Sequence, residues 1–202
     1  MSGPAWIRYN CLRDLLGFDE NNAEVKSARS EMLLDNQVQS LILDVGNWEL
    51  ELLKRHNDSV HPLHKLVFLA DIGVNKHDEK IPEIISTIMS HRSIEKPFQV
   101  LSNYPTVFGG SGKNEWLWCL CDAPSILYAL SKMGYMDHPQ IRLAIDYLAE
   151  LGRINGWPCK ADQQLPNFKG PGKSSDPCPY ANLLMLKLLA LRSEEGDFLK
   201  IQ

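Results

Sequence analysis

The chain has 202 residues, 44% of them hydrophobic, and a formal net charge of −4, so it is long enough for one substantial core or two small ones. Because acidic and basic residues are interspersed without a basic stripe, we expect no nucleic-acid partner. The longest apolar run, residues 181–191, is too short to span a bilayer, and five cysteines without the spacing of a disulfide scaffold favour a reduced, cytoplasmic protein.

Residues 1–60 are predicted to form an N-terminal helical segment, because apolar side chains recur there at helical spacing. The three stretches contain Trp6, Leu12, Leu15 and Leu16, then Val25, Ala28, Met32 and Leu33, and then Val38, Leu41, Ile42, Val45 and Trp48. We therefore expect two to four helices here. They precede a repetitive part, residues 61–202, within one continuous domain.

Two helical hairpins are predicted in residues 61–151. Their apolar stripes are Leu63, Leu66, Val67 and Ala70; Ile81, Ile84, Ile85 and Ile88; Ile126, Leu127, Leu130 and Met133; and Ile141, Ile145, Leu148 and Leu151. Gly73 corresponds to Gly134 and His77 to His138, with the same offset of 61 residues in both cases. A repeat of this length indicates hairpins that stack to bury what a single hairpin cannot.

A third copy of the repeat begins in residues 176–191, and its helix is apolar nearly all round from Leu183 to Leu191. Such a helix must be covered on most sides, which fits an inner layer of helices wrapped by an outer layer. No strand is predicted. The longest irregular stretches are residues 99–115 and 160–175, and long loops of this kind are often functional.

Repeated hairpins, each followed by an aromatic turn such as "INGWPC" (154–159), resemble the α/α-toroid superfamily, which includes terpenoid cyclases and protein prenyltransferase β subunits. Asn155, Gly156 and Trp157 match the last part of the family's Gln-and-Trp repeat motif, whose glutamine is missing. The resemblance covers roughly residues 60–191. It implies an all-α fold, a partial α/α toroid of stacked hairpins. A full toroid usually has more hairpins, so the chain is expected to be an open arc, a homodimer, or shortened at its C-terminus.

The resemblance also implies that the N-termini of the inner helices gather at one end of an apolar central pocket. In this chain those N-termini are residues 61–64, 119–124 and 176–180. Side chains at a helix N-terminus can satisfy free backbone amides, and the positive end of the helix dipole favours carboxylates and thiolates. If the three N-termini converge, their side chains form one site.

A zinc motif strengthens this expectation. Asp176 and Cys178 match the Asp-x-Cys spacing of two zinc ligands in prenyltransferase β subunits, and Tyr180 follows as in that motif. The family's third ligand, a histidine further downstream, is missing, because no histidine follows His138. Thiols or an imidazole from neighbouring helix N-termini could take its place, since zinc accepts both. The resemblance thus implies zinc as the cofactor.

The candidate metal ligands are Cys121, Cys159, Cys178 and His64. Three thiolates and an imidazole would make a closed structural site, whereas two thiolates, a carboxylate and water would leave an open one. Asp122 and Asp176 are the candidate catalytic residues, as ligands or acid/base groups. The simpler alternative is that both aspartates cap helices and that the cysteines are small buried apolar residues. Cys119 and Cys11 are expected to belong to the core.

Aromatic residues lie near the same helix N-termini, and Trp116, Trp157 and Tyr180 are candidates for binding an apolar substrate. Core packing is the alternative for all three. His61 is three residues before His64, so one helix face could present both to a polar pocket.

Two functional hypotheses follow. The first is a prenyltransferase- or cyclase-like enzyme with a zinc-dependent apolar pocket, although the family's Asp-x-Asp-Asp and Asp-Asp-x-x-Asp acid motifs are absent. The second is a non-catalytic helical-repeat module that binds a protein or an apolar ligand on its concave face. The string "FGGSGKNEW" (108–116) is not a phosphate-binding loop, because its first glycine is misplaced and Asn114 replaces the hydroxyl residue.

Overall fold

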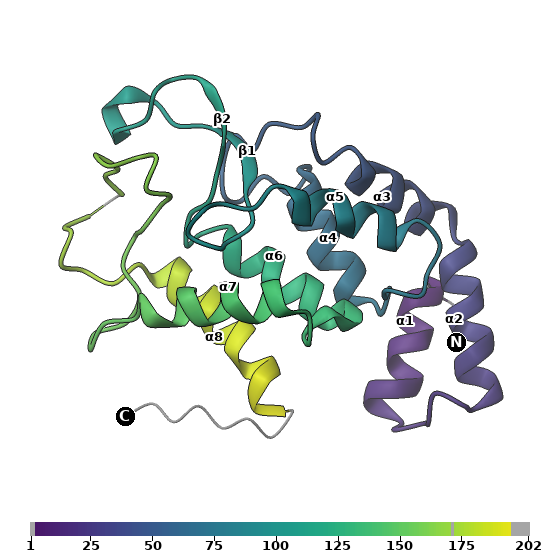
Figure 1. Ribbon diagram of the computed structural model, residues 1–202. Coiled ribbons are helices and arrows are strands. Elements are labelled where there is room, and N and C mark those ends of the chain that lie inside the picture. Colours follow the sequence, from purple (N-terminus) through teal and green to yellow (C-terminus); the bar gives the residue numbers. More distant parts are fainter. Residues whose placement is uncertain (1–2, 171, 195–202) are drawn as a thin grey trace.

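The computed structural model describes residues 3–170 and 172–194, and this part of the chain is predominantly helical, as predicted (Figure 1). The α-helices are α1 (Ala5–Asn10), α2 (Ala23–Leu34), α3 (Asn36–Gly46), α4 (Pro62–Asp71), α5 (Ile81–Ser90), α6 (Ala123–Leu130), α7 (Pro139–Glu150) and α8 (Pro179–Glu194). π-Helical turns continue α1 and α6 at Cys11–Leu15 and Ser131–Tyr135. Within the described residues, no helix is both long and apolar enough to cross a membrane.

A small antiparallel sheet was not expected from the sequence. β1 (Val100–Asn103) pairs with β2 (Asn114–Leu117), and Val100 lies opposite Leu117. The prediction of irregular structure for residues 99–115 was wrong at both ends of this segment. Each strand has only four residues, which is too short for an alternating pattern to stand out from the surrounding loop.

The starts of the helices follow local signals. Pro62, Pro124 and Pro139 lie in the first turns of α4, α6 and α7, where a missing backbone N–H costs nothing. His61 and His138 cap α4 and α7, because each imidazole Nδ1 accepts a hydrogen bond from a first-turn backbone amide. The expected helices of residues 61–151 are therefore confirmed.

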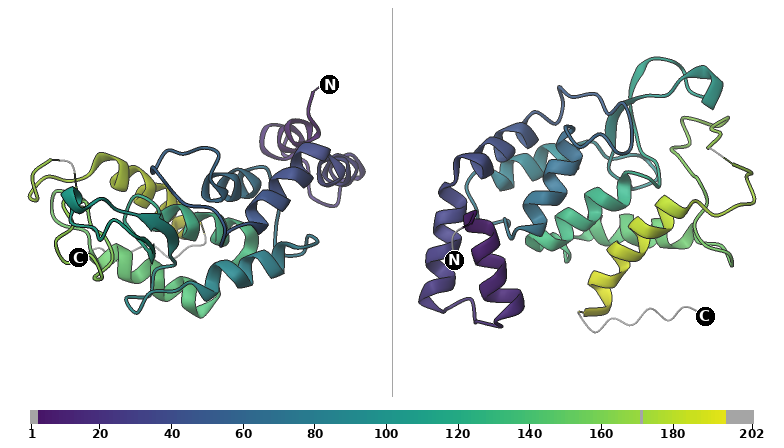
Figure 2. Two further views of the ribbon diagram at one scale, coloured as in Figure 1. Left: turned by 90° about the horizontal axis from the view of Figure 1, so that it is seen from above. Right: turned by 180° about the vertical axis from the view of Figure 1, so that it is seen from behind.

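Helices α4, α6 and α8 form a row, in which α4 packs against α6 and α6 packs against α8 (Figure 2). At one end of the row, the hydroxyl of Tyr180, in the first turn of α8, approaches the carbonyl of His56, which precedes α4, at 3.4 Å. At the other end, the Asp71 carboxylate of α4 accepts hydrogen bonds from Lys132 at 2.8 Å and Lys187 at 3.3 Å. The helices thus run in the same direction, which is compatible with the inner layer of a partial toroid.

Helix α6 lies at the centre of this row, and all eight of its residues are buried. The main apolar core extends from Tyr9 to Leu189. A second, smaller cluster lies at the N-terminal end of α6 and consists of Leu117, Cys119, Cys121, Ala161 and Leu165. Two of the cysteines are therefore packed in a local cluster of their own, apart from the main core.

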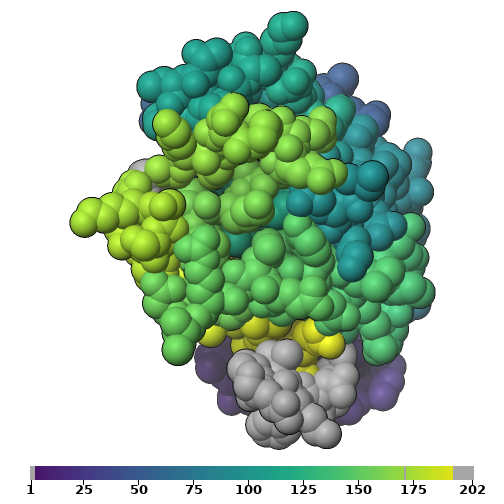
Figure 3. Space-filling view, turned by 60° about the vertical axis from the view of Figure 1, so that its left-hand side comes forward, coloured from purple at the N-terminus to yellow at the C-terminus, as the bar shows by residue number. Residues whose placement is uncertain are grey.

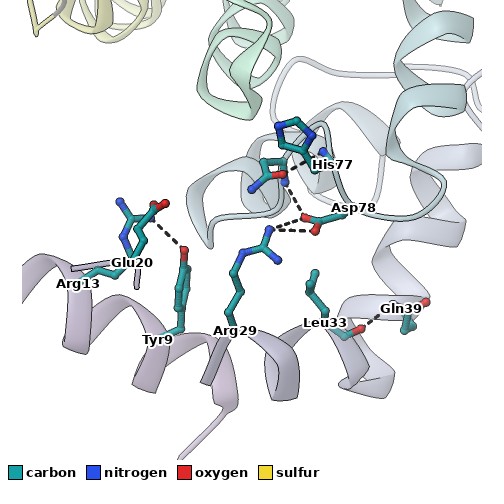
Figure 4. Close-up of polar contacts among 9 residues, drawn as sticks. Tyr9, Arg13, Glu20, Arg29, Leu33, Gln39, His77 and Asp78 are labelled. Carbon is teal, nitrogen blue, oxygen red and sulfur yellow. Dashed lines mark hydrogen bonds and ion pairs between the residues drawn. The ribbon is translucent and has the colours of Figure 1, made fainter. Parts of the chain in front are cut away.

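The N-terminal hairpin of α1 and α2 projects at one end of the molecule (Figure 1) and docks on the loop between α4 and α5 (Figure 4). Arg29 of α2 donates from one guanidinium nitrogen to both carboxylate oxygens of Asp78, at 2.8 and 2.9 Å. Gly73 has a φ of +100°, and a Cβ added there would lie 2.6 Å from the Tyr9 ring. Glycine is required here for both reasons.

Candidate metal centre

Three segments that are distant in the chain bring their sulfur atoms together. Cys121 precedes α6, Cys159 follows α7, and Cys178 precedes α8. The three Sγ atoms lie within 4.8 Å of one another. Sulfur ligands of one tetrahedral zinc ion lie roughly 3.8 Å apart, given bonds of about 2.3 Å. The three predicted cysteine ligands therefore form a group that could hold a metal ion.

Backbone hydrogen bonds connect the loops that carry these cysteines. The Leu120 amide donates to the Lys160 carbonyl at 2.9 Å, and the Cys178 amide donates to the Trp157 carbonyl at 2.8 Å. The Asn182 side chain of α8 also bonds both the amide and the carbonyl of Trp157, at 3.1 and 2.9 Å. The loop after α7 is thus fastened to the segments before α6 and α8, which fixes the spacing of the thiols.

A second group shares Cys121. His56 Nδ1, Cys119 Sγ and Cys121 Sγ also lie within 4.8 Å of one another. Cys119 is 1% exposed, so it is a core residue, as expected. It is also one of the three residues of a group that could hold a metal ion. His56 was missed by sequence reasoning, because it lies in an irregular stretch before α4 without any motif around it.

Asp122 connects the members of this second group. Its Oδ1 accepts from His56 Nδ1 at 2.9 Å, and its Oδ2 accepts from Cys119 Sγ at 2.8 Å. Asp122 occupies the N-cap position of α6, but its side chain makes no capping bond there. The carboxylate is 1% exposed. For Asp122, the alternative of a simple helix cap is therefore wrong, because its two oxygens are directed to the histidine and the thiol.

Hydrogen bonds within the cluster change the pKa values of its histidine and cysteines. The hydrogen bond to Asp122, helped by Cys119, raises the pKa of His56 to about 11. Burial acts to raise the pKa of Cys119, but hydrogen bonds from Cys121 and His56 lower it overall. A hydrogen bond from Cys121 lowers the pKa of Cys159 to about 7. Hydrogen bonds from Cys119 and Cys159, together with burial, raise the pKa of Cys121. Of these thiols, Cys159 therefore ionises close to neutral pH in the metal-free cluster, and the thiolate is the form that binds metals.

A cavity of about 630 Å³ lies beside the cluster, and His56 is part of its wall. Its apolar and aromatic lining includes Leu53, Tyr104, Phe108 and Tyr180. Tyr104 and Tyr180 also pack against the cluster that contains Cys119 and Cys121. Cationic side chains join the lining at Lys54 and Arg55. Among the predicted substrate-binding residues, Tyr180 lies in this cavity.

A second cavity, of about 420 Å³, is lined by Cys159, Cys178 and Asp176 and by residues 168–170 and 172–174 of the loop after α7. Figure 3 shows this yellow-green loop across the face of the molecule, below the teal loop that follows β1. A Cβ added at Gly170 would lie 2.2 Å from Cys159 Sγ. The backbone therefore passes directly over this sulfur atom, and only glycine leaves room for it. Asp176 is exposed.

The two predicted histidines lie elsewhere. His64 belongs to neither metal-ligating group; it lines a cavity of about 90 Å³ between α4, α6 and α8, and its Nε2 is buried without a hydrogen-bond partner among the described residues. His61 is 4% exposed, and its Nε2 lies 3.3 Å from the Glu51 carbonyl. The histidine beside the thiols is thus His56, which precedes α4, and not His64 of α4, as was predicted from the sequence.

The two predicted tryptophans line neither of the larger cavities. The Trp116 ring stacks on His91, with ring centroids 3.5 Å apart. The Trp157 indole is half-buried and donates to the Leu148 carbonyl at 2.9 Å. Both rings are therefore placed by packing, which was the alternative considered for them.

None of the five cysteines forms a disulfide. Comparison of the chain with protein-family models, with curated proteins and with solved structures found no match. The resemblance to α/α-toroid proteins therefore stays a prediction.

Proposed function

We propose that the protein is an enzyme of the prenyltransferase or terpenoid-cyclase type, with zinc bound by cysteine thiolates next to an apolar substrate pocket. The observation that carries this proposal is the meeting of Cys121, Cys159 and Cys178 within 4.8 Å. Two cavities adjoin the cluster, so molecules bound in them would lie near the metal. The parallel row of α4, α6 and α8 supports a partial α/α toroid as the scaffold.

Zinc is the metal that best suits this ligand set. Thiolates are soft ligands that select zinc among the common divalent ions, and zinc prefers four ligands in a tetrahedron. Three protein ligands leave the fourth position for water or substrate, as in catalytic zinc sites. When bound, zinc would lower the pKa of a thiol or water in that position.

The 630 Å³ cavity supports an apolar substrate with an anionic end. Leu53, Phe108 and Tyr180 offer apolar and aromatic surface to a hydrocarbon chain. Lys54 and Arg55 offer positive charge to a carboxylate or a diphosphate. An isoprenoid diphosphate combines both features, and we take this class as the substrate of the proposed enzyme.

Two measurements test the proposal. Protein purified without added zinc is expected to contain close to one equivalent or more of metal, and less than roughly a tenth of an equivalent would count heavily against it. Farnesyl diphosphate is expected to bind in calorimetric titration, and Phe108→Ala should weaken it about tenfold, because an aromatic contact contributes about 0.5–1.5 kcal/mol. Val107→Ala, at an exposed neighbour outside the cavity lining, is the control and should bind normally.

Burial of the thiols favours a second candidate. Cys121 is 6% exposed, and structural zinc sites are closed to solvent, whereas catalytic sites keep an open position. The zinc would then only fasten three loops of a helical-repeat module that binds a protein or an apolar ligand on its concave face. Unchanged ligand binding in a Cys121→Ser/Cys178→Ser double variant would favour this module over the enzyme.

A further inference from the structure

We propose that the protein binds a second metal ion, held by His56, Cys119, Cys121 and Asp122 next to the first. This inference rests on the proposed function, because Cys121 belongs to both groups of ligands and its thiolate would bridge the two ions. The donor atoms of His56, Cys119 and Cys121 lie within 4.8 Å of one another. Each group therefore offers three donors at metal-binding spacing, with one sulfur in common.

Asp122 completes the second group. Its two oxygens lie 2.9 Å from His56 Nδ1 and 2.8 Å from Cys119 Sγ. Donors around one tetrahedral zinc ion lie roughly 3.3–3.8 Å apart, given bonds of about 2.0–2.3 Å. Small side-chain shifts would thus replace two hydrogen bonds by coordination to a shared ion. Two thiolates, one imidazole and one carboxylate close a tetrahedral site.

Burial and charge give an independent reason for the second ion. Asp122 is 1% exposed, and a buried carboxylate is costly unless it is paired or bound to a metal. A dication in the first group alone would leave this carboxylate with the half-exposed imidazole of His56 as its cationic neighbour. A dication in the second group would neutralise it directly.

The two sites differ in what they leave open. The first group has three protein ligands and a fourth position for a small molecule, whereas the second group is closed by four protein ligands. The second ion is therefore structural. It fixes His56, which lies in the wall of the 630 Å³ cavity, against the segment before α6, and so holds that cavity in shape next to the first ion.

The test is the zinc content of the full chain. Protein is stripped with a chelator, reconstituted with zinc alone, freed of excess metal and analysed by native mass spectrometry, which counts the ions in the folded molecules. We expect two zinc ions in the unmodified protein and one in both Cys119→Ser and His56→Ala. His56 is half-exposed, so its variant keeps the test valid if Cys119→Ser does not fold. Cys11→Ser, in the N-terminal hairpin, is the matched cysteine control and should keep two.

The possible results separate this inference from the proposed function. One zinc ion in the unmodified protein, retained in Cys119→Ser, would overturn the second site and leave the first standing. Two ions that both persist in Cys119→Ser and His56→Ala would also overturn it, because the second ion would lie elsewhere. Protein that retains no zinc would overturn the proposed function together with the second site.

Discussion

Asp122 sets the charge of its neighbours in the metal-free protein. Its hydrogen bond raises the pKa of His56 to about 11, so the imidazole binds its proton more tightly in the folded than in the unfolded chain. The contribution of this pair to stability is full below about pH 6.5 and is lost as the pH rises towards about 11. Of the candidate residues, Asp122 therefore has the clearest electrostatic role.

Replacing Asp122 by asparagine is expected to bring the pKa of His56 down towards about 6.5, the ordinary value of histidine. The reason is that a neutral amide no longer favours the charged imidazolium. NMR titration of the imidazole in chelator-treated protein measures this directly. Asp176→Asn, at an exposed carboxylate in the neighbouring cavity, should leave His56 unchanged. A His56 pKa that stays high in Asp122→Asn would show that another group holds the proton.

Gly170 controls the position of one sulfur ligand. A Cβ at this residue would lie 2.2 Å from Cys159 Sγ, so Gly170→Ala must displace either the loop or the thiol. We expect zinc affinity to fall about 10–100-fold, as when groups that orient a ligand are altered. Competition with a chromophoric chelator measures the affinity. Gly46→Ala, where an added Cβ meets nothing within 4 Å, is the control; equal affinities in both variants would contradict the argument.

Cysteines of the candidate site could be predicted from the sequence, but its histidine could not. Cys121 and Cys178 precede helices whose starts are marked by prolines, so their place at a helix N-terminus follows from local signals. His64 has a similar local signal but points between the helices of the row. His56 reaches the thiols because the irregular chain before α4 folds back over them, and only tertiary structure determines that path.

At the level of elements, helices were predictable and strands were not. Apolar stripes of 10–16 residues identify α4 to α8 almost completely, apart from the short α6, because helical periodicity adds up over several turns. Strands β1 and β2 have only four residues each, which is too short for a periodic pattern to be recognised. They pair across the loop around Gly109, and a local sequence pattern does not reveal this pairing. The loop after α7 was likewise seen as irregular, yet its packing over Cys159 positions a candidate ligand.

The docking of the N-terminal hairpin gives a prediction at this level. The Arg29–Asp78 pair joins α2 to the loop before α5, with side chains 25% and 8% exposed (Figure 4). The free-energy cost of breaking such a half-buried ion pair lies between the cost of breaking a surface pair and that of breaking a buried pair. Arg29→Ala is therefore expected to lower the free energy of unfolding by about 2 kcal/mol, measured by urea denaturation.

The matched control for Arg29 is Arg142. It pairs with Asp137 on the surface, and the two side chains are 53% and 85% exposed. Arg142→Ala should change the free energy of unfolding by less than about 0.5 kcal/mol. Equal losses in both variants would mean that the Arg29–Asp78 pair does not anchor the hairpin.

For the whole molecule, the metal centre lies where the helical row meets its loops. The sequence predicted a common end of α4, α6 and α8, and the segments before all three helices do meet there. In the loop after α7, the buried apolar residues among residues 160–170 and 172–175 are Ala161 and Leu165. Metal binding, rather than apolar burial, is therefore expected to supply much of the stability of this end.

Hydrogen exchange with and without zinc tests this view. A ligand at a hundred times its Kd stabilises the bound form by about 2.7 kcal/mol, which makes opening of its site roughly a hundredfold rarer. The amides of Leu120 and Cys178, which donate to loop carbonyls next to the thiols, should gain protection of about this size. Amides of α2, in the distant N-terminal hairpin, should not change. Equal gains in α2 would show that these sites exchange by opening of the entire molecule, and no gain at Leu120 and Cys178 would mean that metal does not hold the loops.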